Sequence, residues 1–223
     1  TERREELCRC QGIHYLGVGV SGGERGALYG PSMMAGGSPE GYALCQDLLT
    51  AMAAQAEGKP CCAYIGSGGA GHYVKMVHNG IEYGILELLA EAYQWMGQGL
   101  GWDAEQIRKT FAAWKDTELD SYLVEISEKV MGQKAEDGAP LVEKILDVAG
   151  QKGTGKWTAL EGVERGVYIP TIYEAVSARN VSGNRERRLR GAERRREAQR
   201  AGQPRFLAAE ALAGEKALRR ALY

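Results

Sequence analysis

The stretch Gly68-Gly-Ala-Gly-His72-Tyr-Val-Lys75-Met-Val-His78-Asn79-Gly-Ile-Glu82-Tyr83-Gly84 carries two helical patterns at once. The first is a set of apolar residues at three- and four-residue spacing, which predicts a helix with one buried face: Val74, Val77, Ile81, Ile85 and Leu88. The second is a set of hydrogen-bonding residues at i, i+3, i+4, i+7 and i+8: Lys75, His78, Asn79, Glu82 and Tyr83. We therefore expect one long helix whose second face is either solvated or part of a site.

The chemistry of the polar face favours a site. The alternative is an ordinary solvated face with a Lys75 to Glu82 pairing, but solvated faces usually repeat Glu, Lys and Gln. Here the face offers an amine, an imidazole, an amide, a carboxyl group and a phenol within two turns. This set contains a potential base, a potential acid and several further donors.

The composition is that of a globular protein. The 223 residues are 44% apolar and 26% charged, which suffices for one large or two modest domains. No apolar run approaches the roughly 18 residues that a membrane-spanning helix needs. The opening Thr-Glu-Arg-Arg-Glu-Glu lacks the layout of a signal peptide. We expect a cytoplasmic protein without a membrane partner.

The cysteines are odd in number: Cys8, Cys10, Cys45, Cys61 and Cys62. Neither the Cys-x-Cys nor the Cys-Cys pair has a second pair at the spacing of a zinc site. This favours free buried thiols over metal ligands, and no metal site is expected.

The chain opens with the end of a helix over residues 1–11 and a buried strand over Ile13–Val20. Gly17, Gly19 and Gly22 then match G-x-G-x-x-G. No helix is expected directly behind them, and no second strand brings an acidic residue about 20 positions on. The pattern therefore does not predict a dinucleotide site.

Residues 21–37 hold a further glycine-rich segment. It is either an ordinary turn or a loop in which the backbone N–H groups of Ser21, Gly22 and Gly23, with the serine hydroxyl, approach a small anion.

A second G-x-G-x-x-G, Gly66 to Gly71, lies between a short buried strand (Cys61–Ile65) and the long helix, which runs to about Met96. Ahead of the strand, Pro39–Glu57 reads as a helix capped by Ser38. Because the long helix leads to more helix instead of a parallel strand, the glycines indicate the boundary of a helical domain near Gly68. Further helices are expected over Ala104–Trp114, Ser121–Met131, Pro140–Ala149 and Tyr168–Arg179.

The segment Gly150-Gln-Lys152-Gly-Thr154-Gly155-Lys156-Trp157-Thr158 nearly spells a P-loop. Trp157 stands where a magnesium-binding hydroxyl is required, and no strand precedes it, so ATP binding is not expected. Two lysines and a threonine on a glycine loop suit a phosphate contact, and a solvated basic loop is the alternative.

The charge is uneven along the chain. Residues 1–184 hold 16 basic and 24 acidic side chains, whereas residues 185–200 hold 8 basic and 3 acidic ones. Clustered arginines can bind nucleic acid, but no aromatic residues interleave with them. A solvated helix with Glu–Arg pairs is favoured, and no nucleic-acid partner is expected.

Four of these segments, in this order, resemble the 6-phosphogluconate dehydrogenase family: Ser21-Gly-Gly, the Gly68–Gly84 helix, the Gln151–Thr158 loop and the Glu174–Arg179 helix. The resemblance implies an α/β remnant, residues 1–68, from the C-terminal part of a Rossmann-like NADP-binding domain. An all-α helical domain would follow over residues 69–223, with a poorer match in the Arg-rich part 185–223. The fold as a whole would be predominantly helical.

The family's reaction is the oxidative decarboxylation of 6-phosphogluconate to ribulose 5-phosphate and CO2 with NADP, in the pentose phosphate pathway. By resemblance, Lys75 is the base and Glu82 the acid. The residues implied to hold the carboxylate and hydroxyls are Ser21, Gly22, Gly23, His78 and Asn79. Those implied to hold the phosphate are Tyr83, Lys152, Thr154 and Arg179.

The resemblance also implies parts outside this chain. The family's cofactor fingerprint would precede Thr1, so the cofactor-binding residues are unknown. The tail that completes a partner's phosphate site in the homodimer would follow Tyr223, where Lys216–Tyr223 reads as an unfinished helix. We expect the chain alone to be inactive. The alternatives are a catalytically silent homologue acting as a binding or regulatory partner, and a related beta-hydroxyacid dehydrogenase for an unphosphorylated acid.

Overall fold

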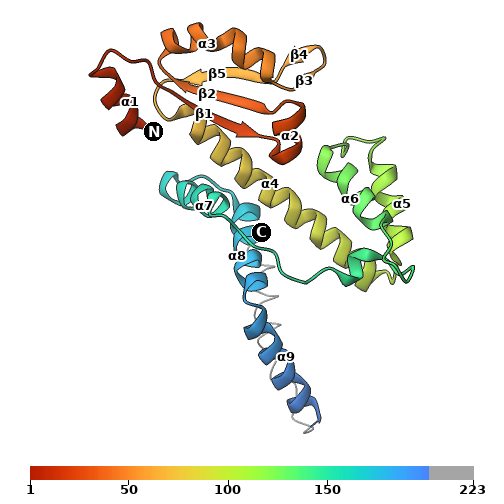
Figure 1. The fold of residues 1–223 in the computed structure, drawn as a ribbon. Coiled ribbons are helices and arrows are strands. Elements are labelled where there is room, and N and C mark those ends of the chain that lie inside the picture. Colours follow the sequence, from red (N-terminus) through yellow and green to blue (C-terminus); the bar gives the residue numbers. More distant parts are fainter. Residues whose placement is uncertain (201–223) are drawn as a thin grey trace. The chain divides into compact units, whose positions relative to one another are not determined.

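The computed structural model describes residues 1–200, which form two compact units (Figure 1). The first unit comprises Thr1–Ile145 and Gln151–Ala178, and the second comprises Leu146–Gly150 and the chain from Arg179 on. The unfinished helix expected over Lys216–Tyr223 lies outside the described residues.

The first 66 residues contain the strands. The elements are α1 (Glu2–Arg9), β1 (Leu16–Ser21), α2 (Gly23–Tyr29), β2 (Ser32–Gly37), α3 (Pro39–Met52), β3 (Gln55–Ala56), β4 (Lys59–Pro60) and β5 (Cys62–Gly66). From residue 70 the chain is helical: α4 (Ala70–Gln94), a π-helical turn η1 (Trp95–Gly99), α5 (Ala104–Trp114), α6 (Tyr122–Gly132), a 3-10 turn η2 (Leu141–Lys144), α7 (Thr154–Arg165), α8 (Pro170–Gly183) and α9 (Arg185–Arg200). The predicted fold class, an α/β remnant followed by an all-α part, is confirmed.

The main sheet has the order β1-β2-β5. β1 pairs antiparallel with β2, starting at Leu16 opposite Gly37, and β2 pairs parallel with β5. The expectation that no helix follows Gly22 directly is wrong, because α2 opens there and β2 follows it. Glycine-rich strands escape recognition because they lack the β-branched and aromatic residues that mark a strand.

The two strands that were expected to be buried are only partly so. β1 begins at Leu16, Ile13 precedes it with 54% exposure, and Val20 is 52% exposed. β5 alternates half-buried and exposed positions. All five cysteines are free thiols, as expected, but none of them is buried.

The helix after the sheet begins where expected. The Ser38 hydroxyl accepts the N–H of Gly41 at 3.1 Å, a normal N-cap. α3 ends at Met52, earlier than expected, because the chain turns into the β3–β4 hairpin. Leu44, on its expected apolar side, is 78% exposed.

Glycines join α4 to the sheet. A Cβ on Gly71 would lie 2.3 Å from the Met34 carbonyl oxygen, and one on Gly36 would lie 2.5 Å from the Gly71 nitrogen. Atoms other than hydrogen do not approach so closely without a bond, so both positions require glycine. Figure 1 shows the N-terminal end of α4 at the sheet.

The burial of α4 reverses one expectation. Of the apolar stripe that was predicted to be buried, Ile81, Ile85 and Leu88 are 50%, 38% and 55% exposed. Tyr83, from the polar stripe, is 8% exposed. The reason is that α4 contacts the sheet, α6 and α7. Within residues 1–200, the strands and helices that pack most closely on α4 contact its polar stripe.

Two apolar clusters hold the helical part together. One contains Tyr83, Ala159, Ile172, Ala175 and Val176. The other contains Met96, Ile107, Phe111 and Val124 and joins the end of α4 to α5 and α6.

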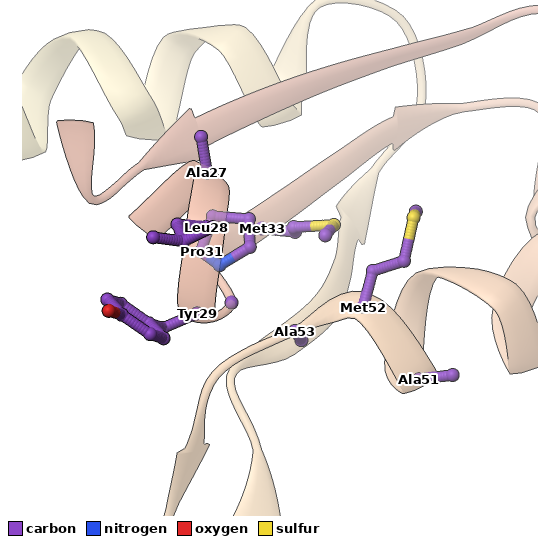
Figure 2. A pocket seen from close by; sticks show the side chains of 9 residues that line it. Ala27, Leu28, Tyr29, Pro31, Met33, Ala51, Met52 and Ala53 are labelled. Atoms are coloured by element: carbon purple, nitrogen blue, oxygen red, sulfur yellow. The ribbon is translucent and has the colours of Figure 1, made fainter. Parts of the chain in front are cut away.

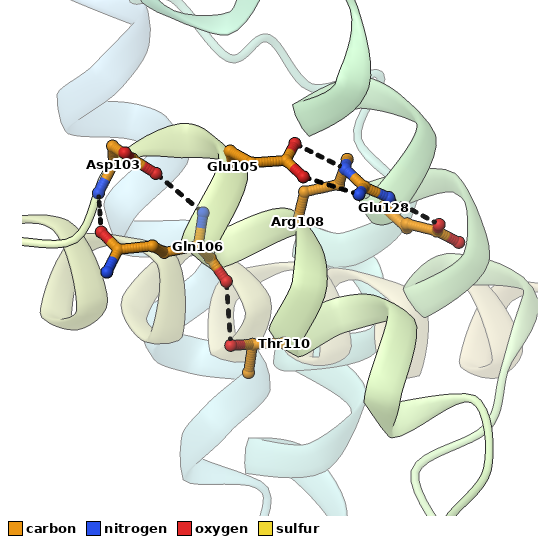
Figure 3. Close-up of polar contacts among 6 residues, drawn as sticks. All are labelled: Asp103, Glu105, Gln106, Arg108, Thr110 and Glu128. Atoms are coloured by element: carbon orange, nitrogen blue, oxygen red, sulfur yellow. Dashed lines mark hydrogen bonds and ion pairs between the residues drawn. The ribbon is translucent and has the colours of Figure 1, made fainter.

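Local chemistry also defines α5. Asp103 forms a capping box with Gln106, and Arg108 bridges Glu105 and Glu128 (Figure 3). Both α5 and α6 lie within a residue of their predicted bounds.

Two predictions for the later part of the chain, one of a helix and one of a loop, were wrong. Pro140–Ala149 contains only the 3-10 turn Leu141–Lys144. The glycine loop expected over 150–158 ends at Gly153, and Thr154 begins α7. The backbone of Gly153 has φ 103°, which suits glycine and permits this sharp start.

The second unit is held by arginines. Arg185 and Arg188 contact the Asp147 carboxylate at 3.0 and 2.7 Å. Their hydrogen bonds lower the pKa of Asp147 to about 2. Along α9, whose described side chains are mostly exposed, Arg190 pairs with Glu186 at 2.9 Å, one pair of the kind expected for a solvated helix. In residues 1–200, no helix combines the length and apolarity needed to span a membrane.

Candidate functional site

The site is built where α7 lies on α4. Arg165, at the end of α7, stacks over the Tyr73 ring at 5.6 Å from its centroid. Thr158, in the middle of α7, bonds to the Met76 carbonyl, and Thr154, at its start, bonds to Asn79. As the residue numbers of the contacting positions increase along α4, those of their partners therefore decrease along α7. The two helices are antiparallel, and the N-terminus of α7 reaches the middle of α4.

A chain of hydrogen bonds crosses this contact. The Lys75 amine donates to Asn79 Oδ1 at 3.2 Å, and Asn79 Nδ2 donates to the Thr154 hydroxyl at 2.6 Å. Two segments that the sequence singled out separately, the polar face of the long helix and the Lys-Gly-Thr segment, thus meet through side chains.

Lys75 also lies against the sheet. A Cβ on Gly19 would fall 2.5 Å from the Lys75 Cβ, so β1 passes directly beside the lysine stem. Gly19 serves this close approach and not a dinucleotide turn, because it lies within β1.

The predicted anion loop follows two residues later. Ser21 ends β1, Gly22 caps α2 with φ 137°, and Gly23 has φ 57°. Side chains rarely adopt these backbone angles, so glycine is needed at both positions. Gly22 and Gly23 are both exposed at the start of α2.

His78 and Glu82 lie one turn apart on α4. Nδ1 of His78 is 3.6 Å from Glu82 Oε2, too long for a hydrogen bond but close enough for an ion pair when the imidazole is charged. His78 Nδ1 has no hydrogen-bond partner among the described residues. The two side chains are 43% and 37% exposed. Both side chains are therefore partly exposed, although the His78 Nδ1 atom itself is buried.

Tyr83 occupies a different environment from its four neighbours on the polar stripe. It belongs to the apolar cluster around α8, and its ring packs against the first turn of α7, where a Cβ on Gly155 would lie 2.5 Å from it. The Tyr83 ring therefore holds the first turn of α7 in place by direct packing.

The start of α7 suits an anion. Its first N–H groups point away from the helix and carry the positive end of the helix dipole. Thr154 lies in the first turn, and the exposed Lys152 precedes it by two residues.

Arg179 belongs to the second unit, where its guanidinium donates to the Gly150 carbonyl at 2.9 Å. Its role as a phosphate ligand stays a prediction.

Two residues of this contact were missed by sequence reasoning. Thr158 is buried at 4% exposure, and a Cβ on Gly80 would fall 2.5 Å from its methyl carbon. A glycine inside a helix and a threonine four residues after Thr154 were the signals that could have found them.

A surface hollow of about 450 Å³ lies elsewhere, between α2, β2 and the end of α3 (Figure 2). It is lined mainly by apolar side chains, among them Leu28, Pro31, Met33 and Met52. None of the predicted site residues lines it.

Family models match most of the chain. The model of the NAD binding domain of 6-phosphogluconate dehydrogenase matches residues 1–66, and that of the enzyme's C-terminal domain matches residues 71–223. The chain belongs to the 6-phosphogluconate dehydrogenase family.

Relatives in the 6-phosphogluconate dehydrogenase family are close. The chain is 50% identical to the decarboxylating 6-phosphogluconate dehydrogenase of Haemophilus influenzae over 190 residues, which is 85% of this chain and 39% of that protein. It is 51% identical to the NADP(+)-dependent, decarboxylating enzyme of Bacillus subtilis, over 85% of this chain and 41% of that one. The chain thus spans about two fifths of the length of these relatives.

Solved structures agree with the 6-phosphogluconate dehydrogenase assignment. The Plasmodium falciparum enzyme, solved in its apo form and in complexes with NADP+ and with 6-phosphogluconate, matches with a TM-score of 0.82 and 45% identity over 86% of this chain and 42% of that one. A 3-hydroxyisobutyrate dehydrogenase of Salmonella typhimurium matches with a TM-score of 0.61 at 17% identity, which shows a shared fold alone.

Proposed function

We propose that this chain is part of an enzyme that oxidatively decarboxylates 6-phosphogluconate to ribulose 5-phosphate and CO2 with reduction of NADP. The observation that carries the proposal is the bonded series Lys75–Asn79–Thr154, which joins an amine on α4 to the anion-binding end of α7. The names of the relatives support the substrate and the cofactor.

Two side chains on α4 suit the proton transfers. Lys75, in its neutral form, takes the proton of the 3-hydroxyl while that carbon is oxidised. After CO2 leaves the resulting 3-keto acid, Glu82 delivers a proton to the enediol carbon. Glu82 lies seven residues along the same helix face, so both groups reach the same side of α4.

The rest of the predicted set holds the substrate. Ser21, Gly22 and Gly23 with His78 and Asn79 bind the carboxylate and hydroxyls. Lys152 and Thr154 bind the phosphate at the start of α7, and we assign Arg179 to the same phosphate. We also assign Tyr83, whose ring contacts the first turn of α7, to this phosphate.

The two glycine runs among the described residues do not fit the pyrophosphate of a dinucleotide. Gly17 and Gly19 lie inside β1, and Gly71 lies against the Met34 carbonyl, so neither glycine run is open to a pyrophosphate. NADP would accept the hydride when bound, but we assign it no residues in this chain. We expect the 223-residue chain alone to bind substrate without reducing NADP.

The remaining assignments follow the family. We propose residues 1–68 as the C-terminal part of the NADP-binding domain and residues 69–223 as the start of the helical domain, in a cytoplasmic homodimer. The family models, which meet between residues 66 and 71, support this division. We expect no nucleic-acid or membrane partner.

Calorimetric titration of the chain with 6-phosphogluconate and with gluconate tests the proposal. We expect 6-phosphogluconate to bind at least about tenfold more tightly, since charge-assisted bonds to a phosphate contribute about 1.5–3 kcal/mol each. Thr154→Val should weaken 6-phosphogluconate binding and leave gluconate binding unchanged. Equal affinities for the two ligands would contradict the proposal, and NADP reduction by the chain alone would contradict its expected inactivity.

A further inference from the structure

Thr158 is a buried polar residue at the centre of the α4–α7 contact. Its hydroxyl donates to the Met76 carbonyl at 2.8 Å, and the Thr154 carbonyl, one turn earlier in α7, lies 3.1 Å away as a second acceptor. The side chain is 4% exposed, so its polar group depends on these partners.

The contact depends on a notch in α4. In a regular helix the Met76 carbonyl already accepts the N–H of Gly80. A second donor can reach it because Gly80 has no side chain: a Cβ there would lie 2.5 Å from the Thr158 methyl carbon and 2.6 Å from its hydroxyl oxygen. The hydroxyl finds the carbonyl and the methyl group fills the notch in a single alignment of the two helices. A shift of α7 by one residue would lose both contacts.

The same alignment decides where Thr154 lies. Thr154 and Thr158 are one turn apart on one face of α7, and their partners Asn79 and Met76 are one turn apart on α4. We propose that Thr158 is a positioning residue: by setting the register of α7 on α4, it places the Thr154 hydroxyl at Asn79 and thereby ties the phosphate contact to Lys75. The link to phosphate rests on the proposed function, whereas the link between the side chains does not.

A ligand-free experiment tests the register itself. A double-mutant cycle between Asn79→Ala and Thr154→Ala, measured by urea unfolding, reports the coupling of those two side chains. In the unaltered chain we expect a coupling of about fivefold in the unfolding equilibrium constant. The cycle is then repeated with Thr158→Val, which keeps the shape and loses the hydroxyl, and with Thr158→Ser, which keeps the hydroxyl.

The expected result is that the coupling disappears with Thr158→Val and survives with Thr158→Ser. Gly80→Ala, which keeps the hydroxyl and fills its notch, should also abolish the coupling and serves if Thr158→Val does not fold. If Thr158 only stabilises the fold, each substitution will lower the stability of the chain, and the coupling between Asn79 and Thr154 will remain intact. Persistence of the coupling in either folded variant would overturn the proposal.

A second measurement examines the consequence for binding. With Thr158→Val, calorimetry should show about tenfold weaker binding of 6-phosphogluconate, the loss of roughly one hydrogen bond to a charged group, and a smaller loss for gluconate. Equal losses for both ligands would overturn the link to phosphate. If the unaltered chain does not distinguish the two ligands, the proposed function fails, while the unfolding cycle still decides the register.

Discussion

The α5–α6 pair and the α4–α7 pair are both antiparallel helix contacts, but they are stabilised by different means. Between α5 and α6, Ile107 and Phe111 are 2% and 1% exposed, and charged pairs around Arg108 line the edge (Figure 3). Between α4 and α7, the Thr158 methyl group fills a glycine notch and a half-buried amide reaches a threonine.

The apolar contacts of α5–α6 mainly stabilise that pair, whereas the hydrogen bonds of α4–α7 mainly align the two helices. Apolar burial is non-directional and scales with area, so it holds α5 on α6 without demanding one register. Hydrogen bonds require particular partners at particular distances, so they define how α7 lies on α4. The proposed chemistry uses the second kind of contact, where an error of one residue would separate Thr154 from Asn79.

The largest expected effect comes from the apolar pair. Phe111→Ala should lower the free energy of unfolding by about 3–5 kcal/mol, since it removes a fully buried ring and leaves a cavity. Urea denaturation measures the loss. Leu119→Ala is the control, because Leu119 is 49% exposed and should cost less than about 0.5 kcal/mol. A loss below about 1 kcal/mol for Phe111→Ala would show that burial does not hold this pair.

An intermediate effect is expected in the notch. Gly80→Ala should destabilise the chain by about 1–3 kcal/mol, because its Cβ would overlap Thr158. Gly84→Ala, one turn along the same helix, makes only ordinary contacts of 3.4 Å or more with Thr171 and Ile172. It should be neutral or gain up to about 1 kcal/mol of helix propensity. Thermal unfolding of both variants checks the contrast, and equal effects would contradict the notch.

The smallest expected effect is the pH dependence of the Glu128 contribution to the α5–α6 pair. A hydrogen bond from Lys115, with nearby positive charges, lowers the pKa of Glu128 below its ordinary value of 4.5. Because the folded pKa is the lower one, this stabilisation is fully present above about pH 4.5 and is lost as the pH falls through the folded pKa.

Stability measured from pH 6 to pH 3 should therefore fall less in Glu128→Gln than in the unaltered chain. The side chains of Asn79 and Thr154 are uncharged, so their coupling across the α4–α7 contact should not change over that range. A coupling that falls together with the Glu128 contribution would remove the distinction between the two pairs.

The better-predicted parts of the chain are those governed by local rules. α5 and α6 were located within a residue from their regular apolar spacing, and in the structure Asp103 and Ser121 cap them. Pro140–Ala149 carried apolar residues without a cap of this kind, and it forms only a single 3-10 turn. β2 was missed because its glycines lack the side chains that mark a strand. α7 was missed because the glycines at its start were read as part of a loop.

By itself, the sequence determined the long α4 helix, the change from α/β to all-helical structure and the family, because these depend on residue spacing and on motifs contiguous in the chain. Only the tertiary structure decided which face of α4 meets its neighbours and that Thr154 reaches Asn79. The contact between Thr154 and Asn79 joins residues 75 positions apart. The features that select it are the missing Cβ at Gly80 and the hydroxyl at Thr158. Both act through close packing, which has no periodicity along the chain.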